Sequence, residues 1–206
     1  MKSIRIILNQ TLIAAKSGGD KHFYIFCRTI ADTGCRISEA LSLNSDSIDV
    51  ECSCIRIESL KKRRKGVYRT IPVSYKLIDE IMKTHSENRS DNYSIEVIWK
   101  YSRMTAYRRI VDAMGRAGIF GGQACPKGLR HGFAVRALTA GVPLTLVQRW
   151  LGHSDIKTTG IYLDIVGAEE RSMAQRMWIR TGARTSRQSQ RLPSLRTKRS
   201  GIEPHA

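Results

Sequence analysis

Residues 151–162 read LGHSDIKTTGIY, a stretch in which a predicted helix ends at a glycine, a histidine opens the connection and a tyrosine follows nine positions later. Two earlier stretches accompany it, TGCRISEAL at 33–41 and PKGLRHGFA at 126–134. The first places an arginine directly after a predicted helix end, and the second places one on a predicted helix. From these three stretches we predict the fold and the chemistry of the chain.

The side chains in these stretches match the needs of phosphoryl transfer without a metal. Arginine stays charged, and its planar fork donates two parallel hydrogen bonds to phosphate oxygens. The reaction also needs a nucleophile and a general acid. Arg36, Arg130, His153 and Tyr162 are therefore candidates. Singly, each has a simpler explanation: a surface ion pair of Arg36 with Glu39, a helix end at His153, a half-buried ring at Tyr162. Spacing alone cannot show that they converge.

Composition indicates a globular protein that binds a polyanion. The chain has 206 residues, enough for one domain, or one domain with a tail. Lys and Arg number 35 against 18 Asp and Glu, a net charge of +17, which favours nucleic acid as the partner. A hydrophobic fraction of 41% supports a core and argues against a fully disordered chain. No apolar run approaches membrane-spanning length, so we expect no membrane partner.

The cysteines and the N-terminus point to the cytoplasm. Five cysteines without a regular framework argue against a secreted disulfide scaffold. Cys52 and Cys54 are too close together for the usual zinc knuckle, so we predict no metal. The apolar start of the chain resembles a signal peptide only faintly, because polar residues from Arg5 onward interrupt it.

Periodicity predicts a mostly α fold with one small antiparallel sheet, an α+β class. The predicted strands lie within 47–59 and 67–73, joined by a hairpin-like basic connection at 61–66. The predicted helices span 21–33, 37–41 (a short turn), 74–83, 103–117, 128–140, 143–151, 156–163 and 168–178. We assign 1–180 to the folded body and 181–206, with six Lys and Arg and one acid, to a disordered basic tail.

Taken in this order, the three stretches resemble the boxes of the tyrosine recombinase (phage integrase) family. The resemblance covers about residues 20–180, and the combination is far more specific than any single box. It implies the tyrosine recombinase catalytic-domain fold. It also implies site-specific cleavage and rejoining of DNA strands, with no metal and no nucleotide cofactor because the energy stays in the phosphotyrosyl bond.

The resemblance implies a role for each matching residue. Arg36 and Arg130 clamp the scissile phosphate, and Tyr162 attacks it to leave a 3′-phosphotyrosyl link and a free 5′-hydroxyl. His153 hydrogen-bonds the phosphate or assists in proton handling. Glu39 supports the arginines.

The family also has a lysine in the sheet hairpin, which protonates the leaving 5′ oxygen. The hairpin here offers several lysines: we favour Lys61, directly after the predicted strand, with Lys62 second. The remaining basic side chains, together with Lys62, are expected to contact the DNA backbone: Lys62, Arg63, Arg64 and Lys65.

One position departs from the family pattern. Three residues before the second arginine the family usually has histidine and sometimes lysine, and this chain has Lys127. Lysine is a cationic donor but not a neutral base near pH 7. Activation of Tyr162 then depends more on the positive field of the phosphate site. His131 could partly substitute, although the helix direction is expected to turn it away.

The expected partners are double-stranded DNA and other copies of the chain. Strand exchange in the family needs four protomers on two duplexes. The helix at 168–178 packs either on its own core or on a neighbouring protomer. Only about 20 residues precede the matching region, too few for the family's N-terminal clamp domain, as in the short recombinases that switch fimbrial genes. Accessory DNA-bending proteins are then expected to assist.

Two alternatives to a recombinase stay open. The first is a recombinase-derived DNA-binding regulator with weak or no cleavage, suggested by Lys127 and the missing clamp. The second is a basic helical repressor of unrelated origin, which leaves Tyr162 and the spaced arginines unexplained.

Overall fold

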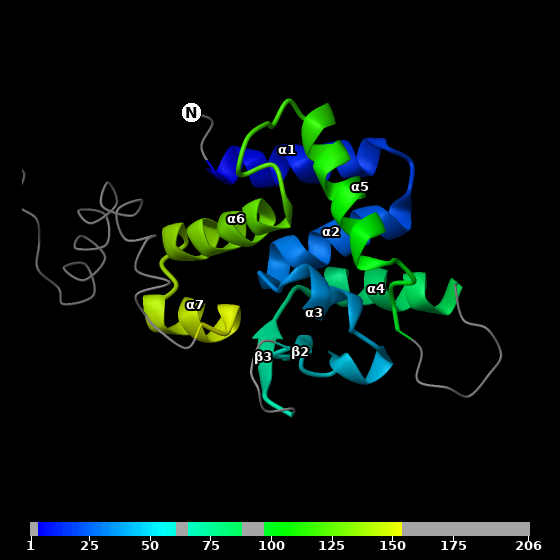
Figure 1. The fold of residues 1–206 in the computed structure, drawn as a ribbon. Helices are drawn as coiled ribbons and strands as arrows, with labels where there is room; N and C mark the ends of the chain where they lie inside the picture. Colours follow the sequence, from blue (N-terminus) through cyan, green and yellow to red (C-terminus); the bar gives the residue numbers. More distant parts are fainter. Residues whose placement is uncertain (1–3, 61–65, 88–96, 154–206) are drawn as a thin grey trace, which may run out of the picture. The chain divides into compact units, whose positions relative to one another are not determined.

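The computed structural model describes residues 4–60, 66–87 and 97–153, and its central element is helix α2 (Lys21–Thr33) (Figure 1). The Asp20 carboxylate caps this helix by accepting a hydrogen bond from the Phe23 backbone N–H at 2.9 Å. One face of α2 is buried, including Phe26 and Ile30. The helix ends at Gly34, which has a left-handed φ of 64°.

Several helices contact α2 on different sides (Figure 1). Three of them, α1 (Ile4–Ser17), α5 (Arg103–Arg116) and α6 (Pro126–Thr139), pack on one another, and α1 and α6 also contact α2. Helix α4 (Tyr75–Glu87) and the short α3 (Ile37–Leu41) also contact α2. Helix α7 (Leu144–Leu151) lies against both α6 and the last strand of the sheet.

The sheet is a three-stranded antiparallel meander. After a 3-10 turn, η1 (Ser45–Ser47), come β1 (Ile48–Asp49), β2 (Cys54–Glu58) and β3 (Tyr68–Pro72), in that spatial order. Ile55 lies opposite Ile71, and Ile57 lies opposite Arg69. These four side chains are buried while their neighbours along β3 are exposed, so the inward face of the sheet carries one arginine among isoleucines.

Two clusters of buried side chains form the core of the described residues. The larger cluster contains residues from each of the helices α1 through α5, from the sheet and from the first half of α6. At its centre the Phe26 ring meets Trp99 and Tyr101 edge-on, with centroids 5.6 and 5.8 Å apart. The smaller lies between the second half of α6 and α7 and contains Phe133 and Leu151.

The structure confirms the predicted fold class and the predicted elements before residue 153, with differences at several helix ends and one helix that was not predicted. Helix α4 continues to Glu87, four residues beyond its predicted end. No helix was predicted before Lys21, whereas α1 packs into the core with Leu8 fully buried. Helix α6 begins two residues earlier than predicted because Pro126 occupies its first turn. Helix α7 begins at Leu144, with Pro143 as its N-cap.

Several predictions fall outside the described residues: the hairpin connection at 61–65, the helices at 156–163 and 168–178, and the tail at 181–206. Among the helices that are described, none is both long and apolar enough to cross a bilayer.

Candidate active site

Three arginine side chains gather around one buried carboxylate, where α2 and α7 end. Glu39, on α3, has no solvent exposure. Its Oε1 accepts a hydrogen bond from Arg36 Nη1 at 2.8 Å, and its Oε2 accepts one from the Arg36 backbone N–H at 2.8 Å. Arg69 Nη2 donates to Oε2 at 2.6 Å and Nη1 to Oε1 at 3.3 Å. The carboxylate therefore fixes two guanidinium groups from distant parts of the chain.

The third guanidinium, that of Arg130, joins the ends of two helices. Arg130 projects from α6 and is buried. Its Nη1 donates to the Gly34 carbonyl at the end of α2, and its Nη2 donates to the Leu151 carbonyl at the end of α7, both at 2.7 Å. Carbonyls in a last helical turn lack intrahelical partners and carry the negative end of the helix dipole. The Arg130 guanidinium therefore donates hydrogen bonds to carbonyls that have no partner within their own helices.

His153 follows α7 and meets Arg130. Its Nε2 lies 2.8 Å from Arg130 Nη2. A guanidinium can only donate, so Nε2 accepts and the ring proton is placed on Nδ1. Burial, followed by the charges of Arg130, Arg36 and Arg69, lowers the pKa of His153 to about 4. The imidazole is therefore neutral at pH 7.

The site carries surplus positive charge. Burial would raise the pKa of Glu39, but the hydrogen bonds and charge of Arg69 and the contacts from Arg36 outweigh it and hold the pKa below its usual value. Burial and the nearby Arg36 lower the pKa of Arg130 to about 10, which leaves it charged at neutral pH. Three guanidiniums and one carboxylate give a formal charge of 3 − 1 = +2. A net positive charge in a partly buried site favours the binding of an anion.

Two glycines with positive φ allow the chain to pass close to the site. A Cβ on Gly34 (φ 64°) would lie 2.3 Å from the Phe133 ring, which packs against the α2 end. A Cβ on Gly152 (φ 68°) would lie 3.2 to 3.3 Å from three guanidinium atoms of Arg69. A side chain at either position would therefore be strained and would press on the groups that hold the arginines.

The structure brings together four of the residues singled out in the sequence: Arg36, Glu39, Arg130 and His153. Arg36 retains 24% side-chain exposure while its partner Glu39 has none, so Arg36 faces outward from the cluster. Neither Tyr162 nor the hairpin residues 61–65 belong to the described part of the chain.

Lys127 lies in the first turn of α6, exposed, three residues before Arg130 and hence on the same side of the helix. His131 is half-buried, and burial, followed by the charges of Arg130 and Lys127, lowers its pKa. Its own charge is among those that lower the pKa of His153, so His131 lies within electrostatic reach of the site.

Arg69 was not predicted from the sequence as a member of the site. Its signal was present in the strand pattern, because alternation along β3 places residue 69 on the same face as the buried Ile71. A charged residue in an inward register indicates either a buried ion pair or a functional group.

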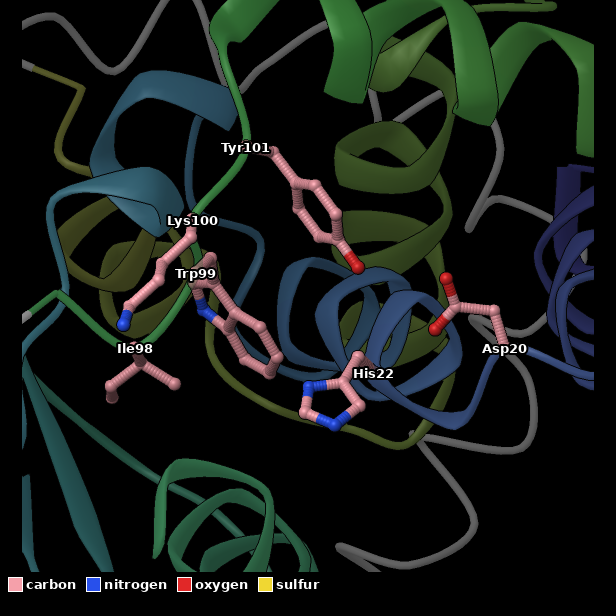
Figure 2. Close-up of a pocket in the computed structure, with 6 residues that line it drawn as sticks. All are labelled: Asp20, His22, Ile98, Trp99, Lys100 and Tyr101. Atoms are coloured by element: carbon pink, nitrogen blue, oxygen red, sulfur yellow. The ribbon is translucent and has the colours of Figure 1, made fainter. Parts of the chain in front are cut away.

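One pocket borders the arginine cluster, and another lies at the opposite end of α2. A cavity of about 360 Å³ lies between β3 and α7, with Arg69 and His153 among its lining residues. A second pocket, of about 250 Å³, contains the α2 N-cap Asp20, at the other end of a helix about 20 Å long (Figure 2). It shares no lining residue with the arginine cluster, and the Asp20 carboxylate in it is used by Phe23 and by Arg109 at 2.5 Å. Within the described ranges, no group of His, Cys, Asp and Glu side chains could hold a metal ion.

Comparison with known proteins identifies the family. Residues 8–168 match the family model described as the phage integrase family. The tyrosine recombinase XerD of Mycobacterium tuberculosis is 33% identical over 140 residues, which cover 63% of this chain and 43% of that protein. The chain spans about half the length of the curated relatives it matches.

Solved structures of recombinases and integrases are similar in fold to this chain. The crystal structure of XerA recombinase is similar with a TM-score of 0.66 and 25% identity, over 83% of this chain and 62% of that one. The catalytic domain of bacteriophage HP1 integrase gives a TM-score of 0.63 at 21% identity, over 86% of this chain and 94% of that domain. The family match, extending over most of the sequence and over every element of the arginine cluster, shows that the chain belongs to the phage integrase family of tyrosine recombinases.

Proposed function

We propose that the protein is a site-specific DNA recombinase that cleaves and rejoins strands through a 3′-phosphotyrosyl intermediate on Tyr162. The observation that carries the proposal is the meeting of Arg36, Arg130 and His153 in one partly buried cluster with surplus positive charge. A phosphodiester is the anion that family membership and the net charge of +17 both favour.

In the proposed reaction, Arg36 and Arg130 bind the nonbridging oxygens of the scissile phosphate and stabilise the charge that these oxygens carry in the transition state. The Tyr162 oxygen attacks phosphorus, and the positive field favours its phenolate form. The bond from phosphorus to the 5′ oxygen breaks, and that oxygen takes a proton from Lys61, with Lys62 as the second candidate. A 5′-hydroxyl from the partner strand then attacks the phosphotyrosine and reseals the DNA.

The neutral state of His153 fits a hydrogen-bonding role. With Nε2 accepting from Arg130, the ring proton lies on Nδ1, and the neutral ring adds no further charge to a site that already holds three guanidiniums. Lys127, one turn before Arg130, is placed to add a cationic donor where the family usually has histidine.

We propose double-stranded DNA as the partner, a tetramer of this chain in synapsis, and a cytoplasmic, nucleoid-associated location. We assign the catalytic domain to residues 1–180 and a basic tail to 181–206. We also propose that the basic residues 62–65 contact the DNA backbone and attract DNA regardless of its sequence.

The test is a covalent-adduct assay. Duplexes that bind the protein are selected from a random-sequence pool, and nicks are tiled along them so that cleavage releases a short fragment and traps the intermediate. After denaturation, we expect DNA linked to the wild-type protein, none linked to Tyr162→Phe, and normal adduct with Tyr75→Phe, a control at a 65% exposed position on α4.

The same assay decides between the recombinase and the regulator. DNA binding without any adduct, at every nick position, would overturn the proposed chemistry and favour a DNA-binding regulator derived from a recombinase. An adduct that persists in Tyr162→Phe would show that another residue is the nucleophile.

A further inference from the structure

Arg69 is buried at the inward face of β3, among isoleucines. Its side chain is 5% exposed, and the residue lies opposite Ile57 in the sheet. Removing a guanidinium from water costs several kcal/mol unless its hydrogen bonds and charge are matched inside the protein. A buried arginine at a position where the strand pattern calls for an apolar residue therefore needs a specific set of partners.

The structure supplies those partners from three separate segments. Arg69 Nη1 and Nη2 straddle the two oxygens of Glu39 on α3. Nη1 also donates to Ser59 Oγ at 3.2 Å, just after β2. Nε donates to the Trp150 carbonyl in the last turn of α7 at 2.7 Å.

Each of these segments carries a residue of the proposed site. Glu39 holds Arg36 through both its backbone and its guanidinium. Trp150 lies three residues before His153. The backbone of Gly152, between them, passes so close to the Arg69 guanidinium that a Cβ added there would contact it. Ser59 lies two residues before Lys61 in the sequence.

Arg69 is not arranged to bind the phosphate itself. A guanidinium has five N–H donors, and the bonds to Glu39, Ser59 and Trp150 occupy four of them. Its 5% side-chain exposure contrasts with 24% for Arg36, which shares the same carboxylate. Arg36 therefore faces the exterior, and Arg69 lies beneath it.

We infer that Arg69 is a positioning residue that locks α3, the end of β2 and the end of α7 together, and so sets the geometry of Arg36 and His153. This inference rests on the proposed function for its effect on cleavage. The bidentate pairing with Glu39 requires the planar fork, so lysine, which offers a point charge, cannot reproduce it. A displacement of the site by about 1 Å is enough to slow an enzymatic reaction roughly 100-fold.

The test compares Arg69→Lys and Arg69→Met with Arg56→Met, a matched control on the neighbouring strand whose exposed guanidinium stacks on Tyr68. We expect the single-turnover rate of adduct formation to fall about 100-fold in both Arg69 variants, with DNA affinity and its salt dependence within a few-fold of wild type. Arg56→Met keeps the wild-type rate.

A second check does not depend on DNA cleavage. Because Arg69 is one of the cations that hold the pKa of His153 down, NMR titration should show that pKa rising in Arg69→Met and unchanged in Arg56→Met. Arg69→Lys keeps the positive charge but loses the fork that binds Glu39 and Trp150, so a His153 pKa that differs from wild type in this variant reports displacement of the site and not loss of charge. If Arg69→Met does not fold, Arg69→Lys, which keeps a positive charge beside the buried Glu39 carboxylate and leaves the Arg36 pairing untouched, carries the measurements.

The outcomes separate this inference from the proposed function. Wild-type cleavage rates in folded Arg69→Lys and Arg69→Met would overturn it. The inference would also be overturned if DNA affinity and the dependence of that affinity on salt both fell along with the cleavage rate, because Arg69 would then contact phosphate directly. If the wild-type protein forms no adduct, the proposed function fails, and the His153 titration in Arg69→Lys, which keeps the charge but not the planar fork, decides the positioning inference: a pKa equal to that of wild type would overturn it.

Discussion

Replacing Glu39 by glutamine should strongly destabilise the protein, because the carboxylate is the negative centre of the arginine cluster. Each of its oxygens accepts two hydrogen bonds, one from Arg36 and one from Arg69. Glutamine keeps one oxygen and puts an amide NH2 in place of the other, so two donors lose their acceptor and face another donor. At about 1.5–3 kcal/mol for each hydrogen bond to a charged group, the loss is about 3–6 kcal/mol. Breaking a buried ion pair typically costs about 3–5 kcal/mol.

The measurement is urea unfolding followed by circular dichroism at pH 7, with Asp79→Asn as the control. Asp79 pairs with Lys83 on the surface, where both side chains are at least 41% exposed, and this change should cost less than about 1 kcal/mol. Because the pKa of Glu39 is lowered in the folded protein, its stabilising effect is present above the unfolded value and is lost as the pH falls through the folded pKa. The difference between wild type and Glu39→Gln should therefore shrink in acid. A cost below about 1 kcal/mol at pH 7 would refute the view that this carboxylate organises the cluster.

Three further changes test other parts of the account. The pKa of His153 is about 4 in the folded protein against about 6.5 unfolded, so the unfolded chain binds more protons between these values. Stability should therefore fall as the pH drops through this window, and urea unfolding of His153→Gln should lack that share of the decline. Replacing all four residues 62–65 with alanine should reduce the slope of log affinity against log salt by about 3–4, measured by fluorescence anisotropy, and an unchanged slope would remove them from the DNA interface. Lys127→Ala should slow adduct formation on nicked DNA more than it weakens binding, and unchanged cleavage would remove Lys127 from the catalytic set.

The fold could be predicted from the sequence where local chemistry marks it. The α2 helix is bounded by Asp20, an acceptor for its first turn, and by Gly34, which adopts a left-handed conformation. The strands of the sheet follow from alternating isoleucines. Helix α1 escaped prediction because much of its buried stripe consists of small or polar residues, such as Thr11 and Ala15, which carry a weak periodic signal.

Four residues that the structure brings together could be singled out from the sequence, but Arg69 and the contacts that join them could not. Sequence order singled out Arg36, Arg130 and His153, whose charges and hydrogen-bonding groups act on DNA in the proposed reaction. It could not show that Arg69 reaches Glu39 from 30 residues away, or the Trp150 carbonyl from 81 residues away, because such contacts depend on how α3, β3 and α7 pack.

The most direct test of the central claim is a crystal structure of Tyr162→Phe bound to a DNA duplex selected for binding. We predict that the scissile phosphodiester lies within hydrogen-bonding distance of the guanidiniums of Arg36 and Arg130 and of the His153 ring, with the ring at position 162, from the same or a neighbouring protomer, beside the phosphorus. A complex in which DNA binds elsewhere, or in which no protomer brings position 162 near the arginine cluster, would contradict the account.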